Sequence, residues 1–488
     1  MTSSFAPGKM VAVSDQSHDD VHRSGSGLKG VLTYAAMLAL GAGGFFLVRH
    51  FGTDLIAPSP SGPDIFGAGG DSKVKVDTLM HVLLALAVII VTARGVGAVF
   101  VYLSQPPVIG EVIAGLLLGP SLLGRIAPSA SAFILPPSVA PFLGVLAQVG
   151  VVLYMFLVGA ELDLSRLRKL AHSTVAISHA SIIAPFLLGS ALALALYTRF
   201  STSDVPFTHF ALFLGVAMSV TAFPVLARIL TDRGIQSTPM GTVALTCAAV
   251  DDVSAWCLLA IVVSVASNTG GGALLTLGLS AVYVVVMLAV VRPLLARLAT
   301  WQAQRPSLSR GVLALVCVLL LVSALTTEAI GIHALFGAFA LGAMMPHDSS
   351  LAADLKSRLE DLVVVFLLPA FFAYTGMRTQ IGLVGDAESW AWCLMIVLTA
   401  SVGKFGGSFL AARASGFGWR QAASLGILMN TRGLVELIVL NVGLDLRVIS
   451  PRLFAMLVIM AVVTTLSTTP ILQALSVLRP AEPLPERA

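Results

Sequence analysis

Two adjacent aspartates inside an apolar stretch are the residues best suited to chemistry in this chain. Asp251 and Asp252 lie in the middle of the run 239–267, which is otherwise largely apolar. A carboxylate near the centre of a bilayer costs at least about 2.5 kcal/mol on insertion scales. Two hard oxygen ligands suit a small alkali cation, and a desolvated carboxylate is equally a site for a proton. We therefore predict a site for H⁺ and for Na⁺ or K⁺; the alternative is a structural pair tied to an arginine or to backbone donors.

One lysine is placed to interact with these acids. Lys404 is the only one of seven lysines that lies deep inside an apolar run. An ammonium group there needs a carboxylate partner, and the two aspartates are the obvious candidates. If this pairing competes with the bound ion, Lys404 is a coupling device. A permanent ion pair between two helices is the alternative, and it leaves the transport interpretation unchanged.

Two polar interruptions predict broken helices about 210 residues apart. Proline within a span removes a backbone donor and frees carbonyl groups one turn earlier. Crossing two such breaks near the midplane brings helix-dipole ends together, where charged side chains neutralise them. The residues concerned are Ser219, Thr221 and Pro224 in the first break and Arg432, Gly433 and Glu436 in the second.

The composition identifies the environment in which these residues work. Hydrophobic residues make up 57% of the 488 and charged residues 11%, and the mean hydropathy is +0.93. Soluble domains carry roughly 25% charged residues, so the chain is predicted to be an all-α polytopic membrane protein rather than a soluble enzyme, a disordered chain or a disulfide scaffold. The net charge of +4 is small, so nucleic acid is not an expected partner.

The apolar runs predict about fourteen membrane spans. One lies near 29–49, with a polar tail before it and a linker rich in Pro and Gly after it. It is interpreted as an uncleaved anchor rather than a signal peptide, because the run ends in Arg49 and His50 instead of small residues. The others are expected at 78–103, 108–124, 139–160, 173–198, 208–231, 239–267, 273–298, 309–328, 332–346, 360–377, 390–414, 421–444 and 452–476.

The distribution of basic residues predicts that both termini are cytoplasmic. With the N-terminus inside, roughly sixteen Lys and Arg fall on that side against roughly eight on the other, as the positive-inside rule requires. The chain is expected to be a multi-pass protein of the plasma membrane. The last segment, after 476, is too short for a nucleotide-binding regulatory domain.

An internal repeat is visible in the sequence. The segment 110–120 resembles 331–342, about 220 residues later, and 156–159 is similar to 372–376. Splitting thirteen spans as six, one linker and six makes the halves enter the membrane from opposite sides. This is the inverted-repeat arrangement of secondary transporters. Glu111, His333, Arg94 and Arg228 are interpreted as structural or hydrated groups near the ends of spans.

These motifs together resemble a known family. TAFPVLARIL at 221–230, AAVDDV at 248–253, Lys404 and NTRGLVEL at 430–437 are similar to the monovalent cation:proton antiporters of the second family, the bacterial sodium/proton exchangers and their plant cation/proton relatives. The resemblance covers roughly residues 78–476. It implies thirteen family helices with crossed discontinuous helices, a homodimer, a dimerisation panel and a core that carries the ion by elevator-like displacement.

The resemblance also assigns segments to these parts. It implies a cytoplasmic tail at 1–28, an extra N-terminal helix and external linker at 29–77, panel segments at 78–168 and 309–378, core segments at 173–267 and 390–476, a linker helix at 273–298 and a short cytoplasmic tail at 477–488.

It further implies roles for individual residues. Asp252 is implied to be the essential carboxylate for ion and proton, and Asp251 its partner. Lys404 is implied to pair with Asp251 in the ion-free state, and Thr221 to be a candidate ligand. Relatives from plants usually have Asn at the first aspartate position, so Asp251 favours Na⁺, whereas the surrounding motifs are closer to potassium-handling members.

The expected function is therefore proton-coupled Na⁺ or K⁺ exchange, with no enzyme activity and no cofactor. Membrane lipids and a second copy of the chain are the expected partners. A gated K⁺ efflux channel and an organic-anion symporter of the same architecture are the alternatives. Proton flux driven by imposed cation gradients distinguishes an antiporter from these two alternatives.

Overall fold

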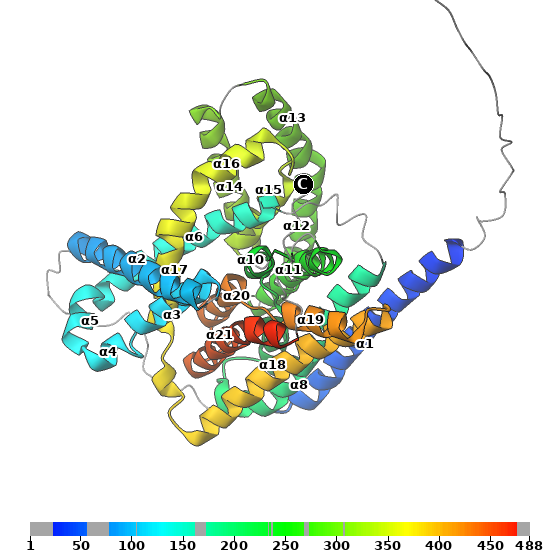
Figure 1. Ribbon diagram of the computed structural model, residues 1–488, viewed down its shortest axis with the longest axis horizontal. Helices are drawn as coiled ribbons and strands as arrows, with labels where there is room; N and C mark the ends of the chain where they lie inside the picture. The colour runs from blue at the N-terminus through cyan, green and yellow to red at the C-terminus, as the bar shows by residue number, and fades with distance from the viewer. Residues whose placement is uncertain are drawn as a thin grey trace, which may run out of the picture.

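The computed structural model describes residues 23–55, 78–103, 105–161, 172–232, 234–235, 238–267, 273–305 and 308–475, and the regular secondary structure of this part is helical throughout (Figure 1). Eleven of the described helices are long and apolar enough to cross a membrane, or up to twelve spans if a bent pair is counted as one. Two shorter apolar helices, Phe207–Ser219 and Ala334–Met344, accompany them. The all-α polytopic membrane fold is confirmed.

The helices follow the predicted runs closely. Their bounds are α1 Arg23–Gly52, α2 Thr78–Tyr102, α3 Pro107–Leu118, α4 Leu123–Ile126, α5 Pro128–Ile134, α6 Ala140–Glu161, α8 His172–Phe200, α9 Phe207–Ser219, α10 Phe223–Asp232, α11 Pro239–Ser267, α12 Ala273–Val286, α13 Arg292–Ala303, α14 Arg310–Ile330, α15 Ala334–Met344, α16 Ser350–Asp361, α17 Leu368–Arg378, α18 Ala387–Ala414, α19 Trp419–Met429, α20 Leu434–Asp445 and α21 Pro451–Ala474. Wide helical turns at Met287–Val291 and Leu362–Leu367 join α12 to α13 and α16 to α17.

One boundary differs clearly from the prediction. The span expected to begin at 360 is preceded by α16, so helix extends back to Ser350. Its charged residues lie on one face while Leu351, Leu355 and Leu359 are buried on the other, which is the pattern of an amphipathic helix. The tails at 1–22 and 476–488, the linker at 56–77 and the basic segment at 162–171 lie outside the described residues.

Four helices pack closely through glycine to form the centre of a first helix body, α2–α6 with α14–α17. A Cβ added at Gly115 of α3 would lie 2.2 Å from the carbonyl oxygen of Phe372 in α17, so only glycine permits this approach. The same contact recurs between α15 and α6, where a Cβ at Gly342 would lie 2.1 Å from the carbonyl oxygen of Phe156. The segments whose sequences repeat therefore make the same helix–helix contact twice.

A second helix body is formed by α8–α11 and α18–α21. Within it α18 lies against α8, and a Cβ at Gly403 would come 2.6 Å from Cα of Pro185. This close approach brings the next residue, Lys404, beside the serines of α8. The hydrogen bonds of Asp251 fasten α11 to the same pair of helices.

The helix α1 lies outside the repeat and runs along α8 (Figure 1). Phe45 packs on Phe186, with ring centroids 5.8 Å apart, and the ring of Tyr34 meets that of His179 edge-on at 4.7 Å. The extra N-terminal helix is therefore attached to the second body.

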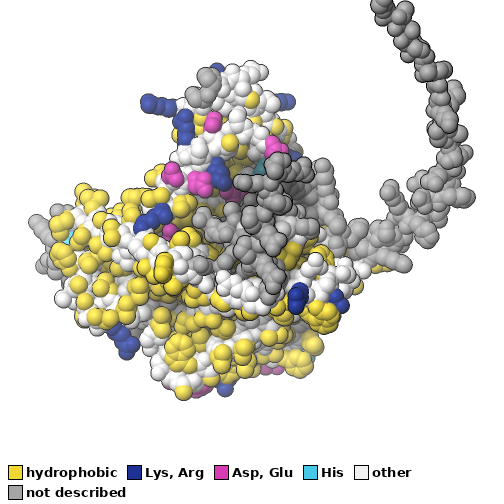
Figure 2. Space-filling model, viewed as in Figure 1, with side chains coloured by type: hydrophobic (Ala, Val, Ile, Leu, Met, Phe, Trp, Pro, Cys, Tyr) yellow, Lys and Arg dark blue, Asp and Glu magenta, His cyan; other side chains and the backbone are white. Residues whose placement is uncertain are grey.

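The surface agrees with a membrane setting. Hydrophobic side chains cover much of the face shown in Figure 2, and many of its charged side chains gather at the end where α13 and α16 lie. Large apolar residues such as Leu325, Val91 and Leu410 are more than 60% exposed, which is unfavourable in water and ordinary in lipid.

Candidate functional site

Two interrupted helices meet in the second body. The chain is non-helical at Val220–Ala222 between α9 and α10 and at Asn430–Gly433 between α19 and α20, and the latter two helices are bent by 43°. The backbone N–H of Ala222 donates to the carbonyl of Thr431 at 3.0 Å. The breaks therefore bond to each other through their backbones, which satisfies groups that neither helix satisfies alone.

Glycine and proline explain why the breaks fall at these places. A Cβ at Gly433 would lie 2.5 Å from Cγ2 of Val225 and 3.2 Å from Cβ of Ala222, so a side chain would push the two segments apart. Pro224 is the second residue of α10, where a missing N–H costs nothing because the first turn has no intrahelical acceptor. The proline thus begins a new helix after the break.

Asp251 accepts hydrogen bonds from two helices, α8 and α18, and from the break between α9 and α10. Ser178 and Ser181 of α8 donate to its two oxygens at 2.6 and 2.5 Å, and the Thr221 hydroxyl lies 2.8 Å from Oδ2. Lys404 Nζ of α18 lies 3.1 Å from the same Oδ2 and 2.5 Å from Thr221 Oγ1. Both charged side chains are fully buried. Of the two aspartates, Lys404 is therefore paired with Asp251 in this arrangement.

Asp252 is in the opposite situation. It is also fully buried, yet among the described residues neither of its carboxylate oxygens has a hydrogen-bond partner. The backbone N–H of Phe223, the first residue of α10, lies near the carboxylate without completing a bond of good geometry. An unpartnered buried carboxylate is costly, so Asp252 is the acid that gains most from a bound proton or cation.

A second ion pair lies at the crossing. Arg432 Nη1 is 2.8 Å from Oε2 of Glu436, and both side chains are fully buried. The guanidinium also donates to the carbonyls of Ala217 and Met218 at 2.8 and 2.7 Å. These carbonyls belong to the last turn of α9, so Arg432 neutralises the negative end of that helix dipole. Glu436 stands in the first turn of α20, the positive end of its own helix.

Ser219 is not brought to the acids. Its hydroxyl donates to the carbonyls of Gly215 and Ile182 at 2.7 and 3.0 Å. In this conformation Ser219 closes the end of α9 and makes no hydrogen bond to Asp251 or Asp252. Of the two hydroxyls predicted for the site, the structure places only that of Thr221 there.

The other polar residues of the repeat lie apart from this cluster. Glu111 is buried in α3 and lies 3.6 Å from the guanidinium of Arg94. His333 caps the N-terminus of α15 with a φ of 73° and accepts from the N–H of Leu335. The side chain of Arg228 is outside the described part of the structure.

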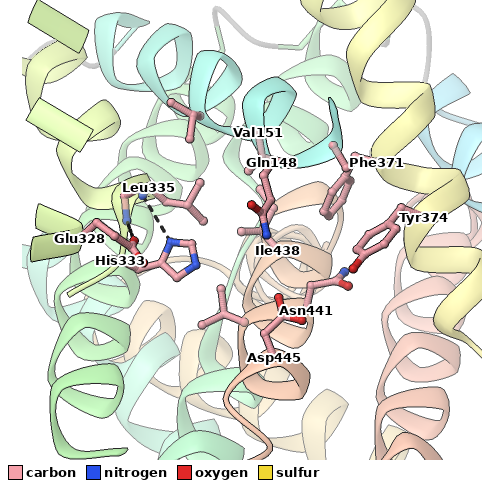
Figure 3. A pocket seen from close by; sticks show the side chains of 14 residues that line it. Gln148, Val151, Glu328, His333, Leu335, Phe371, Tyr374, Ile438, Asn441 and Asp445 are labelled. Atoms are coloured by element: carbon pink, nitrogen blue, oxygen red, sulfur yellow. Dashed lines mark hydrogen bonds between the residues drawn. The ribbon is translucent and has the colours of Figure 1, made fainter. Parts of the chain in front are cut away.

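A cavity of about 210 Å³ opens between the two bodies (Figure 3). Its polar lining comes from both sides: Gln148, Glu328, His333 and Tyr374 from the first body, Asn441 and Asp445 from α20 of the second. Neither Asp251 nor Asp252 lines it. The structure therefore shows the two acids closed off from this cavity.

Sequence reasoning missed the two serine donors. Ser178 and Ser181 lie three residues apart in α8, on one helical face, inside the apolar run 173–198. Polar residues on one face of such a run were the available signal. Trp256, one turn after Asp252, was also missed; its indole nitrogen is buried and has no hydrogen-bond partner among the described residues, while its ring packs edge-on against Phe336 of α15.

Comparison with known proteins finds relatives that match most of the chain. A family model described as "Sodium/hydrogen exchanger, transmembrane" matches residues 82–474. The chain is 46% identical over 397 residues to "Na(+)/H(+) antiporter NhaS4" of Synechocystis sp., which covers 81% of this chain and 97% of that protein. It is 41% identical over 409 residues to "Cation/H(+) antiporter 20" of Arabidopsis thaliana; that match covers 80% of this chain and 48% of the plant protein.

Among solved structures, the sodium proton antiporter MjNhaP1 of Methanocaldococcus jannaschii at pH 8 is similar with a TM-score of 0.60 at 16% identity. The match covers 82% of this chain and 99% of that one. At this identity the likeness concerns the fold. The helix α1 precedes the matched residues 82–474.

Proposed function

The chain belongs to the sodium/hydrogen exchanger family, and from this premise we propose that it is a proton-coupled monovalent cation antiporter. The observation that carries the proposal is the contrast between two neighbouring acids. Asp251 has four side-chain partners, whereas Asp252, equally buried, has none among the residues that the structure describes. A carboxylate in that state binds either H⁺ or a small cation, and competition for one place is sufficient to couple the two fluxes.

The proposed cycle begins from the arrangement of Lys404 described above. A cation that enters between Asp251 and Asp252 neutralises the charge that Lys404 neutralises now, and the ammonium group withdraws from Asp251 while it keeps its hydrogen bond to Thr221. Protonation of Asp252 then releases the cation, and Lys404 returns to Asp251. Ser178 and Ser181 hold the Asp251 carboxylate in place throughout, so that only Asp252 gains and loses a proton.

The helix breaks provide the setting for this exchange. The backbone N–H of Phe223, at the start of α10, lies toward Asp252, and backbone carbonyls freed by the breaks are proposed as further oxygen ligands. Thr221 belongs to the first break and reaches both Asp251 and the carbonyl of Met429. Because Arg432 and Glu436 hold the crossing together, both breaks move as one unit.

Alternating access is proposed to occur by displacement of one body against the other. Close packing through glycine rigidifies each body internally, whereas a cavity lies between them. The first body is proposed as the panel that forms a homodimer in the plasma membrane, and the second as the moving core. The helix α1 is packed on α8 and is proposed to travel with the core.

Na⁺ is the favoured cation. The presence of Asp251 at the first acidic position and the similarity to NhaS4, whose name specifies Na⁺ and H⁺, support this choice. K⁺ is the second candidate, because the motifs around the breaks resemble those of potassium-handling members.

Proteoliposomes containing a pH-sensitive dye test the proposal. Imposed Na⁺ or K⁺ gradients should drive proton movement in the parent protein and none in Asp252→Asn. The exposed acid Asp348, whose side chain is 97% exposed, supplies the matched control Asp348→Asn, which should exchange at the parent rate. Cation conductance without proton movement would indicate a channel and refute the antiporter assignment.

A further inference from the structure

A polar cluster crosses the boundary between the two bodies at the edge of the cavity. Arg378, the last residue of α17, donates from Nη1 to Oδ1 of Asn441 at 3.0 Å, and its Nη2 lies 2.6 Å from Oδ1 of Asp445. Asn441 in turn donates to Oγ1 of Thr375 at 2.8 Å. Two residues of the first body are thus bonded to two residues of the second.

This cluster is unusually well shielded for a contact between moving parts. Arg378 is 9% exposed and Asn441 is 6% exposed, and the guanidinium lies 5.2 Å from the ring centre of Tyr374. Charge-assisted hydrogen bonds of a buried guanidinium are stronger than those of an exposed ion pair. Asp445 is the member most open to water, with its side chain 43% exposed.

The cluster lies beside the cavity between the two bodies. Tyr374, Asn441 and Asp445 line the cavity, and Figure 3 shows them facing Gln148 and His333 across it. Any sliding of α20 past α17 separates Arg378 from both of its partners. The bonds therefore exist in one arrangement of the two bodies and are lost in another, which is the property of a two-state contact.

We propose that Arg378, Asn441 and Asp445 form a clamp that stabilises the conformation seen here and sets how often the core changes sides. This inference rests on the proposed function for its meaning in transport. The three residues act as positioning residues: they touch no ion at Asp252 and alter transport only through the equilibrium between conformations. A ligand or substitution shifts such an equilibrium only by its differential effect on the two states.

Thiol labelling of a cavity residue measures this equilibrium directly. Gln148 is exposed and lines the cavity, so Gln148→Cys, in a chain whose four native cysteines are replaced, is labelled by a membrane-impermeant maleimide. Labelling rates are compared in full-length protein in proteoliposomes, after size-exclusion chromatography has shown that each variant is folded.

Arg378→Gln and Asp445→Asn are each expected to lower the labelling rate at least threefold. The double variant Arg378→Asp, Asp445→Arg exchanges the two charges. Its labelling rate is expected to lie within twofold of the parent rate. The control is Asp386→Asn, which removes an ion pair with Arg452 that lies entirely within the second body, and it should leave the rate unchanged.

A second variant covers the case in which these proteins fail to fold. Asn441→Asp gives Arg378 a second carboxylate, so it should strengthen the clamp, keep labelling at or above the parent rate and slow turnover at saturating cation severalfold. Unchanged labelling in both clamp variants, an equal fall in Asp386→Asn, or faster turnover in Asn441→Asp would overturn the proposal. Labelling needs no transport, so absence of cation-driven proton flux in the parent would refute the antiporter function and leave this test intact.

Discussion

Substitution of Lys404 by glutamine is expected to destabilise the protein strongly and in a way that a second substitution repairs. Lys404 and Asp251 are both fully buried, and their atoms lie 3.1 Å apart. Removing one member of a buried pair leaves the other charge uncompensated, which costs about 3–5 kcal/mol. Three hydroxyl donors, from Ser178, Ser181 and Thr221, remain on Asp251 and offset part of this cost, so the loss should lie near 3 kcal/mol.

The double variant Lys404→Gln, Asp251→Asn removes both charges at once. Its stability is expected to exceed that of Lys404→Gln by about 2 kcal/mol, since groups in one network couple by up to about 3 kcal/mol. Denaturant titration or thermal unfolding in detergent measures the four proteins of the cycle. If Lys404→Gln were as stable as the parent, or if the two losses simply added, the pairing would have no energetic significance and this description of the site would be wrong.

Three other substitutions test separate parts of the site. Gly433→Ala places a Cβ 2.5 Å from Cγ2 of Val225 and should lower the free energy of unfolding by about 1–3 kcal/mol. The control is Gly278→Ala, where no described atom lies within 4 Å of the added Cβ, and it should not be destabilised. Equal stability of the two variants would show that the crossing tolerates a side chain. Ser181→Ala removes one donor from Asp251 and should lower the free energy of unfolding by about 1.5 kcal/mol, the contribution of a hydrogen bond to a charged group, and a denaturant titration that shows no loss would contradict this. Trp256→Phe removes a buried N–H that has no partner in the described part of the chain, so it should leave thermal stability unchanged or raised, and a clear loss would mean that the indole nitrogen is bonded.

The sequence predicts the helices well because the bilayer imposes a simple rule. A run of about 20 apolar residues is long enough to span, and the run 239–267 is reproduced to the residue by α11. The rule fails where a helix lies partly outside the apolar region. The segment Ser350–Asp361 is too polar to be predicted as a span, yet it is helical because its leucines are buried on one face.

The site is only partly predictable, because sequence shows which residues are costly and not which atoms meet. Asp251, Asp252 and Lys404 stand out since charges in apolar runs are rare. The serines of α8 do not stand out, since a single hydroxyl in a membrane helix usually bonds to its own backbone. Ser219 does bond in that way, whereas Ser181 reaches Asp251 as well. Only the packing of α8 on α11 distinguishes the two cases.

The unequal surroundings of the two aspartates are likewise a tertiary property. Nothing in the adjacent pair indicates that, within the described residues, Asp251 accepts from four side chains while Asp252 accepts from none. The difference arises because successive helical residues point about 100° apart. One side chain therefore faces α8 and α18, and the other faces the start of α10.

Competition between protons and cations at Asp252 is tested most directly by measuring apparent cation affinity as a function of pH in sealed proteoliposomes. If one carboxylate serves both ions, the apparent KM for Na⁺ should rise about tenfold for each unit of pH below the titration of the site, with maximal rate preserved at saturating Na⁺, and Asp252→Asn should show no exchange at any pH. A KM that does not change with pH, or pH-dependent exchange that persists in Asp252→Asn, would contradict the account.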